Sequence, residues 1–198
     1  MARIEPLAPP DWPEGMKDAL APLRPEGARH PLPPREGRPR ALNVLGLFAH
    51  HPALTRAFNT FNGHVLFGSS LSPRQRELLV LRVACLRECD YEWLQHTVLA
   101  QDAGLEPDEV RRVAVGPDAA GWSELDRALL RAADELIGGA DLTEPTWSRL
   151  ADVLDEEQLL DLVFTVGAYE TLAMAFRTFA VEPDADLAAH ELCLPREP

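Results

Sequence analysis

The segment LSPRQRELLVLRVACLRECDYEWLQHTVLAQDAGLEPDEV, residues 71–110, decides the fold of this chain. It opens with Ser72-Pro73-Arg74-Gln75, a capping box with proline at the first helical position, which predicts a helix start. A single helix through the segment would exceed the usual length, and the polar run Arg87-Glu88-Cys89-Asp90 interrupts it. We therefore expect a helical hairpin, in which Cys89 or Asp90 caps the second helix and Gly104 ends it.

Similar signals recur outside the hairpin. Ser123, Thr143 and the run Asp155-Glu156-Glu157-Gln158 are good N-terminal caps, and Gly138-Gly139 supplies a stop. Residues 159–181 are apolar almost all round, which is typical of a helix buried by its neighbours or by another subunit. No alternating strand pattern is long enough to indicate a sheet. The predicted fold class is all-α, a bundle of seven to nine helices built around the hairpin.

Proline divides the chain. The first forty residues hold 10 of the 18 prolines, and each proline removes an N–H donor and restricts the residue before it. We expect a proline-rich arm over residues 1–40, an all-α domain over 41–183 and an acidic tail over 184–198.

Composition excludes several classes of protein. The 198 residues carry a formal charge of −13, which argues against binding to nucleic acid or to an anionic membrane. The N-terminal sequence has no apolar signal region, and we expect no run near the roughly 20 apolar residues that span a bilayer. Three cysteines make no disulfide framework. A cytoplasmic protein with reduced thiols is predicted.

The candidate chemistry gathers in CLRECDYEWLQH, residues 85–96. Glu92 and His96 lie four residues apart and share a helix face, so the carboxylate should raise the pKa of the histidine and select its tautomer. Cys89 lies at the start of the same helix, where the helix dipole stabilises a thiolate.

Neighbouring side chains of the hairpin are candidates for binding a substrate. Tyr91 and Trp93 are expected to line a pocket. Arg82 and Arg74 are expected to bind a carboxylate, because arginine does so in a bidentate way.

The hairpin resembles that of the carboxymuconolactone decarboxylase and alkylhydroperoxidase D (AhpD)-like family, over roughly residues 41–181. In the thiol-peroxidase branch of that family, a glutamate is followed twelve positions later by Cys-x-x-Cys, with a histidine four residues after the second cysteine. Glu77, Cys89 and His96 match this register. Position 92, where the second cysteine should stand, is glutamate.

The resemblance implies an AhpD-like helical fold that forms a homodimer, trimer or hexamer. The missing cysteine argues against a thiol peroxidase, because the sulfenic acid then lacks its resolving thiol. Cys85 is within Cα range of Cys89, but the Cβ vectors of the two residues point the wrong way for an easy disulfide.

The hypothesis is an acid/base enzyme acting on a small organic acid or lactone, with Glu77, Glu92 and His96 handling protons. One alternative is a non-catalytic protein of the same fold that binds a small molecule or serves assembly. Another is a weak alkylhydroperoxidase of the peroxiredoxin type that acts through Cys89.

No cofactor and no metal are expected, since the chain has no HExxH motif and no paired Cys-x-x-Cys. Schiff-base chemistry is excluded because the only lysine, Lys17, lies in the proline-rich arm.

Overall fold

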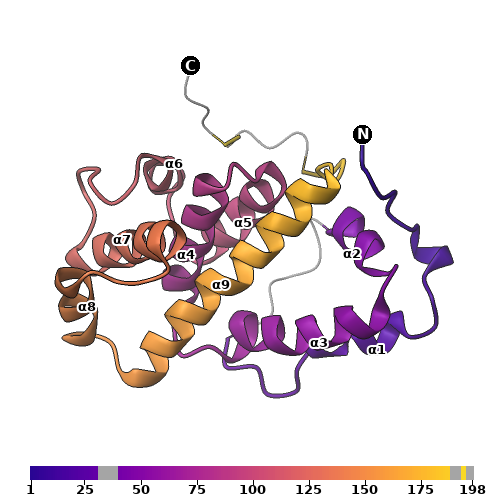
Figure 1. Cartoon of the computed structure of the whole chain (residues 1–198), viewed down its shortest axis with the longest axis horizontal. Helices are drawn as coiled ribbons and strands as arrows, with labels where there is room; N and C mark the ends of the chain where they lie inside the picture. The colour runs from indigo at the N-terminus through magenta and orange to yellow at the C-terminus, as the bar shows by residue number, and fades with distance from the viewer. Residues whose placement is uncertain (31–39, 188–192, 195–198) are drawn as a thin grey trace. The chain divides into compact units, whose positions relative to one another are not determined.

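The structure, a computed structural model, describes residues 1–30, 40–187 and 193–194 (Figure 1). Its regular elements in these ranges are all helical, which confirms the all-α prediction. The chain divides into two compact units, described separately here. One unit comprises residues 1–69 with 175–187, and the other comprises residues 70–174 with 193–194. The domain boundaries expected at residues 40 and 183 stay predictions.

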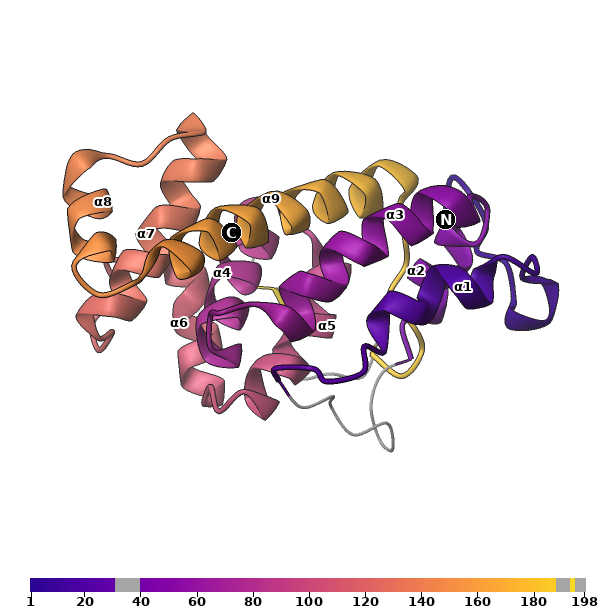
Figure 2. The same cartoon turned by 90° about the horizontal axis from the view of Figure 1, so that it is seen from below.

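The first unit has a small core under the N-terminal segment. Helix α1 lies beside α3 (Figure 2), and Met16, Ala19 and Ala49 form the buried centre. The amide of Leu7 donates to Gly46 O over 3.1 Å, and a Cβ on Gly46 would lie 2.5 Å from Leu7 O. Glycine at position 46 therefore lets the N-terminal segment pack directly on α2. The elements are η1 (Pro9–Asp11), α1 (Met16–Leu20), η2 (Ala21–Leu23), α2 (Leu42–Phe48), α3 (Pro52–Gly63) and the π-helical turn η3 (His64–Gly68).

The second unit is organised around α4 (Pro73–Leu86), which contacts α5, α6 and α7. Nine consecutive residues of α4, residues 76–84, are buried, so this helix is the centre of the core. The remaining helices are α5 (Asp90–Asp102), α6 (Pro107–Val115), α7 (Glu124–Gly139), α8 (Glu144–Ala151) and α9 (Glu156–Phe179), whose last five residues belong to the first unit.

The predicted start and break of the hairpin are confirmed. The amide of Ser72 donates to Gln75 Oε1 (2.7 Å), and the amide of Gln75 donates to Ser72 Oγ (3.2 Å), which completes the capping box. Helix α4 ends at Leu86, and Glu88 turns the chain with φ 49°. Cys89 is the N-cap of α5. Local chemistry therefore determines where both helices of the hairpin begin and end.

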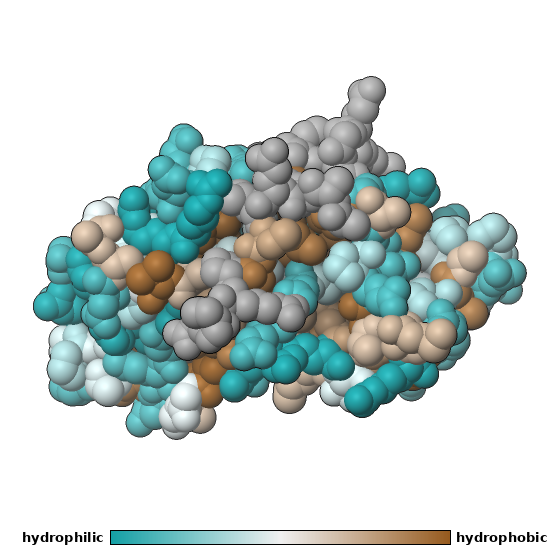
Figure 3. Space-filling model, turned by 90° about the horizontal axis from the view of Figure 1, so that it is seen from above, coloured by the Kyte–Doolittle hydropathy of each residue, from teal (hydrophilic) through white to brown (hydrophobic). Residues whose placement is uncertain are grey.

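Helix α9 corrects one expectation. Its 24 residues are long and apolar enough, by length and composition, to cross a bilayer. A buried core helix has the same signature, and two acidic residues of α9 bind groups within their own unit. Asp161 accepts from Ser70 Oγ over 2.7 Å, and Glu170 accepts from Arg87 Nε over 2.7 Å. The expectation that the protein has no membrane partner stays a prediction. On the face shown in Figure 3, hydrophilic residues predominate and hydrophobic residues lie between them in small groups.

Candidate functional site

A chain of three side chains joins α4 to α5. Glu77 is fully buried on α4, and its Oε2 lies 2.7 Å from Nδ1 of His96 on α5. Arg76 Nε donates to the other oxygen, Oε1, over 2.8 Å. The carboxylate of Glu77 is therefore held between a guanidinium and an imidazole.

The charge on Glu77 determines which ring nitrogen of His96 carries the proton. Burial tends to raise the pKa of Glu77, but His96 and Arg76 outweigh it, so the pKa lies below its ordinary value. An ionised carboxylate can only accept hydrogen bonds, so Nδ1 of His96 carries the proton. Nε2 has no hydrogen-bond partner among residues 1–30, 40–187 and 193–194. Nδ1 of His96 is therefore engaged, and Nε2 remains available for another hydrogen bond.

Tyr169 of α9 covers the imidazole. Its ring meets His96 edge-on, with ring centroids 4.7 Å apart and planes at 86°. Burial and the nearby charge of Glu77 raise the pKa of Tyr169 well above its ordinary value, so its hydroxyl stays protonated. No sequence pattern singled out Tyr169, because an aromatic side chain in an apolar helix usually belongs to the core.

Glu92 is not the partner of His96 that the four-residue spacing predicted, because Glu77 occupies Nδ1. Both carboxyl oxygens of Glu92 are buried without a hydrogen-bond partner in the described part of the chain. Burial and the charge of Glu170 raise the pKa of Glu92 well above its ordinary value. The surroundings of Glu92 therefore favour its protonated form relative to a carboxyl group in water.

The two cysteines of the hairpin have different surroundings. Cys89 is buried as the N-cap of α5, and its amide donates to Ala84 O over 2.9 Å. Cys85 Sγ instead lies 3.8 Å from Ala114 O, at the end of α6. Burial raises the pKa of the Cys85 thiol. No disulfide joins these two described residues.

Arg82 binds protein groups, and its expected contact with a substrate stays a prediction. Its Nε and Nη2 bind the two oxygens of Asp134 over 2.5 and 3.1 Å. Its Nη1 donates to Val113 O and Ala114 O at the end of α6. Gly116 makes room, since a Cβ there would lie 2.8 Å from Arg82 Nη2. Arg82 is therefore a structural clamp.

Arg74 is engaged in the same manner. Its Nη2 lies 2.7 Å from Glu109 Oε1 and 3.0 Å from Asp126 Oδ2. It therefore joins the start of α4 to α6 and α7, and its expected contact with a substrate carboxylate stays a prediction.

The two aromatic candidates belong to the interior. Tyr91 is 3% exposed and Trp93 is 1% exposed. Their proposed contact with a substrate stays a prediction. Among the described residues, no three His, Cys, Asp or Glu side chains gather as a metal site requires.

Comparison with known proteins identifies a family that part of the sequence matches. The model of the carboxymuconolactone decarboxylase family matches residues 52–135, a range that contains Glu77, Glu92 and His96. Over these 84 residues the chain is similar to the carboxymuconolactone decarboxylase family. Among proteins of curated function, none matches this chain.

Solved structures support the AhpD-like fold. An alkylhydroperoxidase AhpD core protein from Ralstonia eutropha JMP134, an uncharacterised peroxidase-related protein, is 21% identical with a TM-score of 0.66, over 81% of this chain and 94% of that one. A peroxidase-related protein from Silicibacter sp. TM1040 is 19% identical with a TM-score of 0.65, over 74% and 78%. A variant of the debrominase Bmp8, in complex with 2,3,4-tribromopyrrole, is 15% identical with a TM-score of 0.71, over 94% of each chain. At these identities the likeness shows the fold of this AhpD-like chain and no activity.

Proposed function

We propose that this AhpD-like protein is an acid/base enzyme that acts on a small organic acid or lactone. The observation that carries the proposal is the buried contact of His96 Nδ1 with Glu77 Oε2, which leaves Nε2 as a base. A carboxylate that orients a histidine and stabilises its protonated form is a recurrent feature of acid/base catalysis.

Glu92 supplies the complementary acid. It shares one face of α5 with His96, one turn earlier. Its raised pKa keeps it protonated, as a proton donor requires. Two groups whose surroundings push their proton affinities apart are a common arrangement of general acid and base.

The proposed step is a proton transfer at carbon. Nε2 of His96 removes a proton from the carbon next to the substrate carbonyl, and the electron pair of the broken C–H bond moves to form an enolate. Glu92 donates its proton to the carbonyl oxygen, which converts the enolate to the enol. In a decarboxylation, the C–C bond to the carboxylate breaks instead, its electron pair forms the enolate as carbon dioxide leaves, and Glu92 donates its proton to the enolate carbon.

The test is deuterium exchange at carbon in D₂O, followed by proton NMR on a panel of γ-lactones and small keto acids. We expect exchange with the wild type, and a loss of at least about 100-fold in the rate for His96→Gln, since a positioned base contributes 10²–10⁴-fold. His50→Gln, at an exposed histidine of the other unit, is the matched control and should exchange normally. Absence of exchange across the panel, or equal rates in His96→Gln and the wild type, contradicts the proposal.

A second candidate function uses the thiol of Cys89. Its position at the start of the 13-residue helix α5 favours it, because a helix N-terminus stabilises a thiolate. Peroxide consumption with dithiothreitol, compared among wild type, Cys89→Ser and Cys193→Ser, tests this function. Turnover that is lost only in Cys89→Ser establishes a thiol peroxidase. Equal rates in all three proteins reject it.

We also propose that the protein forms a homo-oligomer through α9. Four of its apolar residues are exposed in the single chain: Leu160, Val163, Phe164 and Met174. Their spacing places them along one side of the helix, and large exposed apolar patches mark association sites. Light scattering should give an oligomer for the wild type and a smaller species for Phe164→Glu. A monomeric wild type contradicts this proposal.

A further inference from the structure

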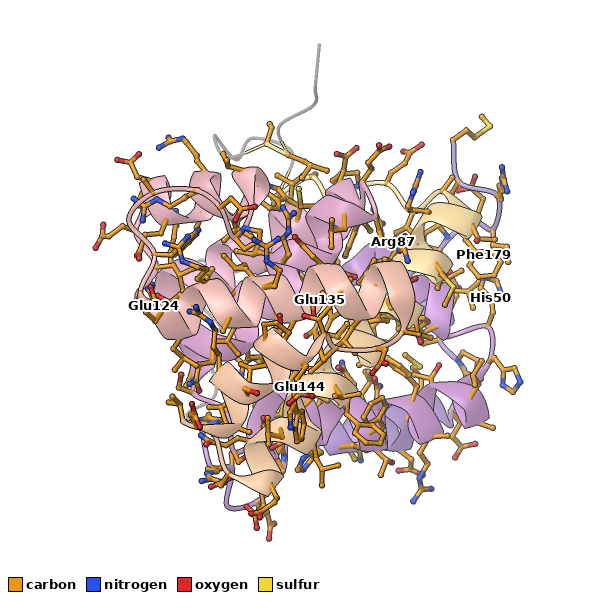
Figure 4. All side chains as sticks on the ribbon, turned by 60° about the vertical axis from the view of Figure 1, so that its left-hand side comes forward. His50, Arg87, Glu124, Glu135, Glu144 and Phe179 are labelled. Atoms are coloured by element: carbon orange, nitrogen blue, oxygen red, sulfur yellow. The ribbon has the colours of Figure 1, made fainter. Side chains whose placement is uncertain are left out.

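A cavity of about 430 Å³ lies between α7 and α8, in the second unit. Three arginines line it: Arg127 and Arg131, one turn apart on α7, and Arg149 on α8. Figure 4 labels Glu124 and Glu135 on α7, and Glu144 at the start of the neighbouring helix α8. Three guanidinium groups around one cavity are unexpected in a chain with a formal charge of −13.

The one acidic residue of the cavity, Glu135, is already satisfied. Its Oε1 accepts from the hydroxyls of Thr143 (2.9 Å) and Thr146 (2.8 Å), and its Oε2 accepts from the amide of Thr143 (2.8 Å). Burial tends to raise the pKa of Glu135, but these hydrogen bonds and Arg131 outweigh it and lower the pKa. Glu135 therefore joins α7 to α8 and does not neutralise all three arginines.

The guanidinium groups keep donors for a ligand. Arg127 donates to Pro117 O over 3.1 Å and has no ion pair within residues 1–30, 40–187 and 193–194. Arg131 pairs with Asp118, whose side chain is 80% exposed, and Arg149 pairs with Glu124, whose side chain is 77% exposed. Pairs with partners this exposed contribute little. Since each guanidinium has five N–H donors, several remain at each arginine.

We propose that the α7–α8 cavity binds a small dianionic oxyanion, carried either by a phosphate group or by a dicarboxylate. The planar guanidinium fork matches the oxygens of both groups in a bidentate way. The volume lies within the usual 300–1,000 Å³ of small-molecule sites. The cavity shares no residue with the Glu77–His96 pair, so this binding does not depend on the proposed acid/base activity.

Isothermal titration calorimetry of the full chain with inorganic phosphate, at constant ionic strength and pH 7.5, tests the proposal. We expect one saturable site per chain, weakened about tenfold or more in Arg127→Ala and in Arg131→Ala. Arg111→Ala is the matched control, because Arg111 is also an exposed arginine in an ion pair but lies on α6 outside the cavity. It should bind phosphate within about twofold of the wild type.

A gain in affinity gives an independent test. Asp118→Asn removes the exposed partner of Arg131 and should tighten phosphate binding several-fold. If Arg127→Ala fails to fold by circular dichroism, Arg127→Lys keeps the charge but loses the bidentate fork, and should also weaken binding.

Titration with succinate distinguishes a site for dicarboxylates from a site for phosphate groups. Binding of succinate in competition with phosphate supports a site for carboxylates as well, and binding of phosphate alone supports a phosphate site. The absence of saturable binding of either ion, or an equal loss of affinity in Arg111→Ala and Arg127→Ala, would falsify the proposal.

Discussion

His96 on α5 and Glu77 on α4 are in direct contact, with Nδ1 2.7 Å from Oε2, and the Glu77 side chain has no exposed surface. The second oxygen of Glu77 binds Arg76. The Glu77 carboxylate therefore contributes to stability as well as to the proposed function, because removing it leaves the largely buried guanidinium of Arg76 without its charged partner. The two contributions can be measured separately.

Glu77→Gln should destabilise the protein strongly. Breaking a buried pair from one side costs about 3–5 kcal/mol, so the urea midpoint should fall while the slope of the transition stays unchanged. Glu124→Gln removes the carboxylate of an exposed pair with Arg149 and should change the midpoint far less. Similar midpoints for the two variants would contradict the importance of the buried pair.

The stability difference between the wild type and Glu77→Gln should depend on pH. The pKa of Glu77 is lower in the folded protein than in the unfolded chain, where it is about 4.3. Its contribution to stability is therefore present above about pH 4.3 and is lost as the pH falls through the lower, folded pKa. The difference in unfolding free energy between wild type and Glu77→Gln should accordingly be constant near neutrality and shrink in acid. A difference that grows in acid is the opposite result.

Glu92→Gln should show the reverse dependence. The pKa of Glu92 is raised in the folded state by burial and by Glu170. Its contribution is fully present below the unfolded pKa of about 4.3 and is lost as the pH rises through the folded pKa. Melting temperatures of wild type and Glu92→Gln between pH 4 and pH 8 should therefore move in favour of the variant as the pH rises. Parallel curves would show that folding does not raise the pKa of Glu92.

Arg82→Ala should unfold more easily without altering the chemistry at His96. It removes the clamp on Asp134 and on two carbonyls at the end of α6. A loss of about 3 kcal/mol in unfolding free energy is expected for a largely buried pair. Hydrogen exchange should show α6 opening first. A fully stable variant that loses substrate binding would instead restore Arg82 as a carboxylate ligand.

The three thiols should react with iodoacetamide in a defined order. Cys193 is exposed, Cys89 is buried, and Cys85 is partly buried with a raised pKa, so Cys193 should be alkylated first at pH 7.5. Mass spectrometry over time gives the order of alkylation. The same reaction in urea gives the alkylation rates of the three thiols in the unfolded protein. Rapid alkylation of Cys89 in the native protein would point to an accessible thiolate and favour the second candidate function.

Local features of the hairpin were predictable because their causes are local. The Ser72–Gln75 capping box, the break near Glu88 and the N-cap at Cys89 depend on residues within a few positions of each other. Glu77 and His96 were singled out because the resemblance to the family places both residues in its register. The AhpD-like fold follows from these same features.

The partners of the site residues were not predictable in this way. Glu92 lies on the same face of α5 as His96, but Glu77, nineteen residues before the histidine, occupies Nδ1 because α4 packs against α5. Adjacent residues on a helix point in different directions, so the contact of Arg76 with Glu77 had no sequence signal.

The sequence by itself determined an all-α chain, the ends of its central hairpin and the pair of residues, Glu77 and His96, that carries the proposed chemistry. Only the tertiary structure decided that the pKa of Glu92 is raised, that Tyr169 covers the imidazole and that Arg82 pairs with Asp134. The physical reason is how far apart in the sequence the interacting residues lie. Helix caps and breaks depend on hydrogen bonds between near neighbours, whereas the charge state of a buried group depends on which helices pack around it.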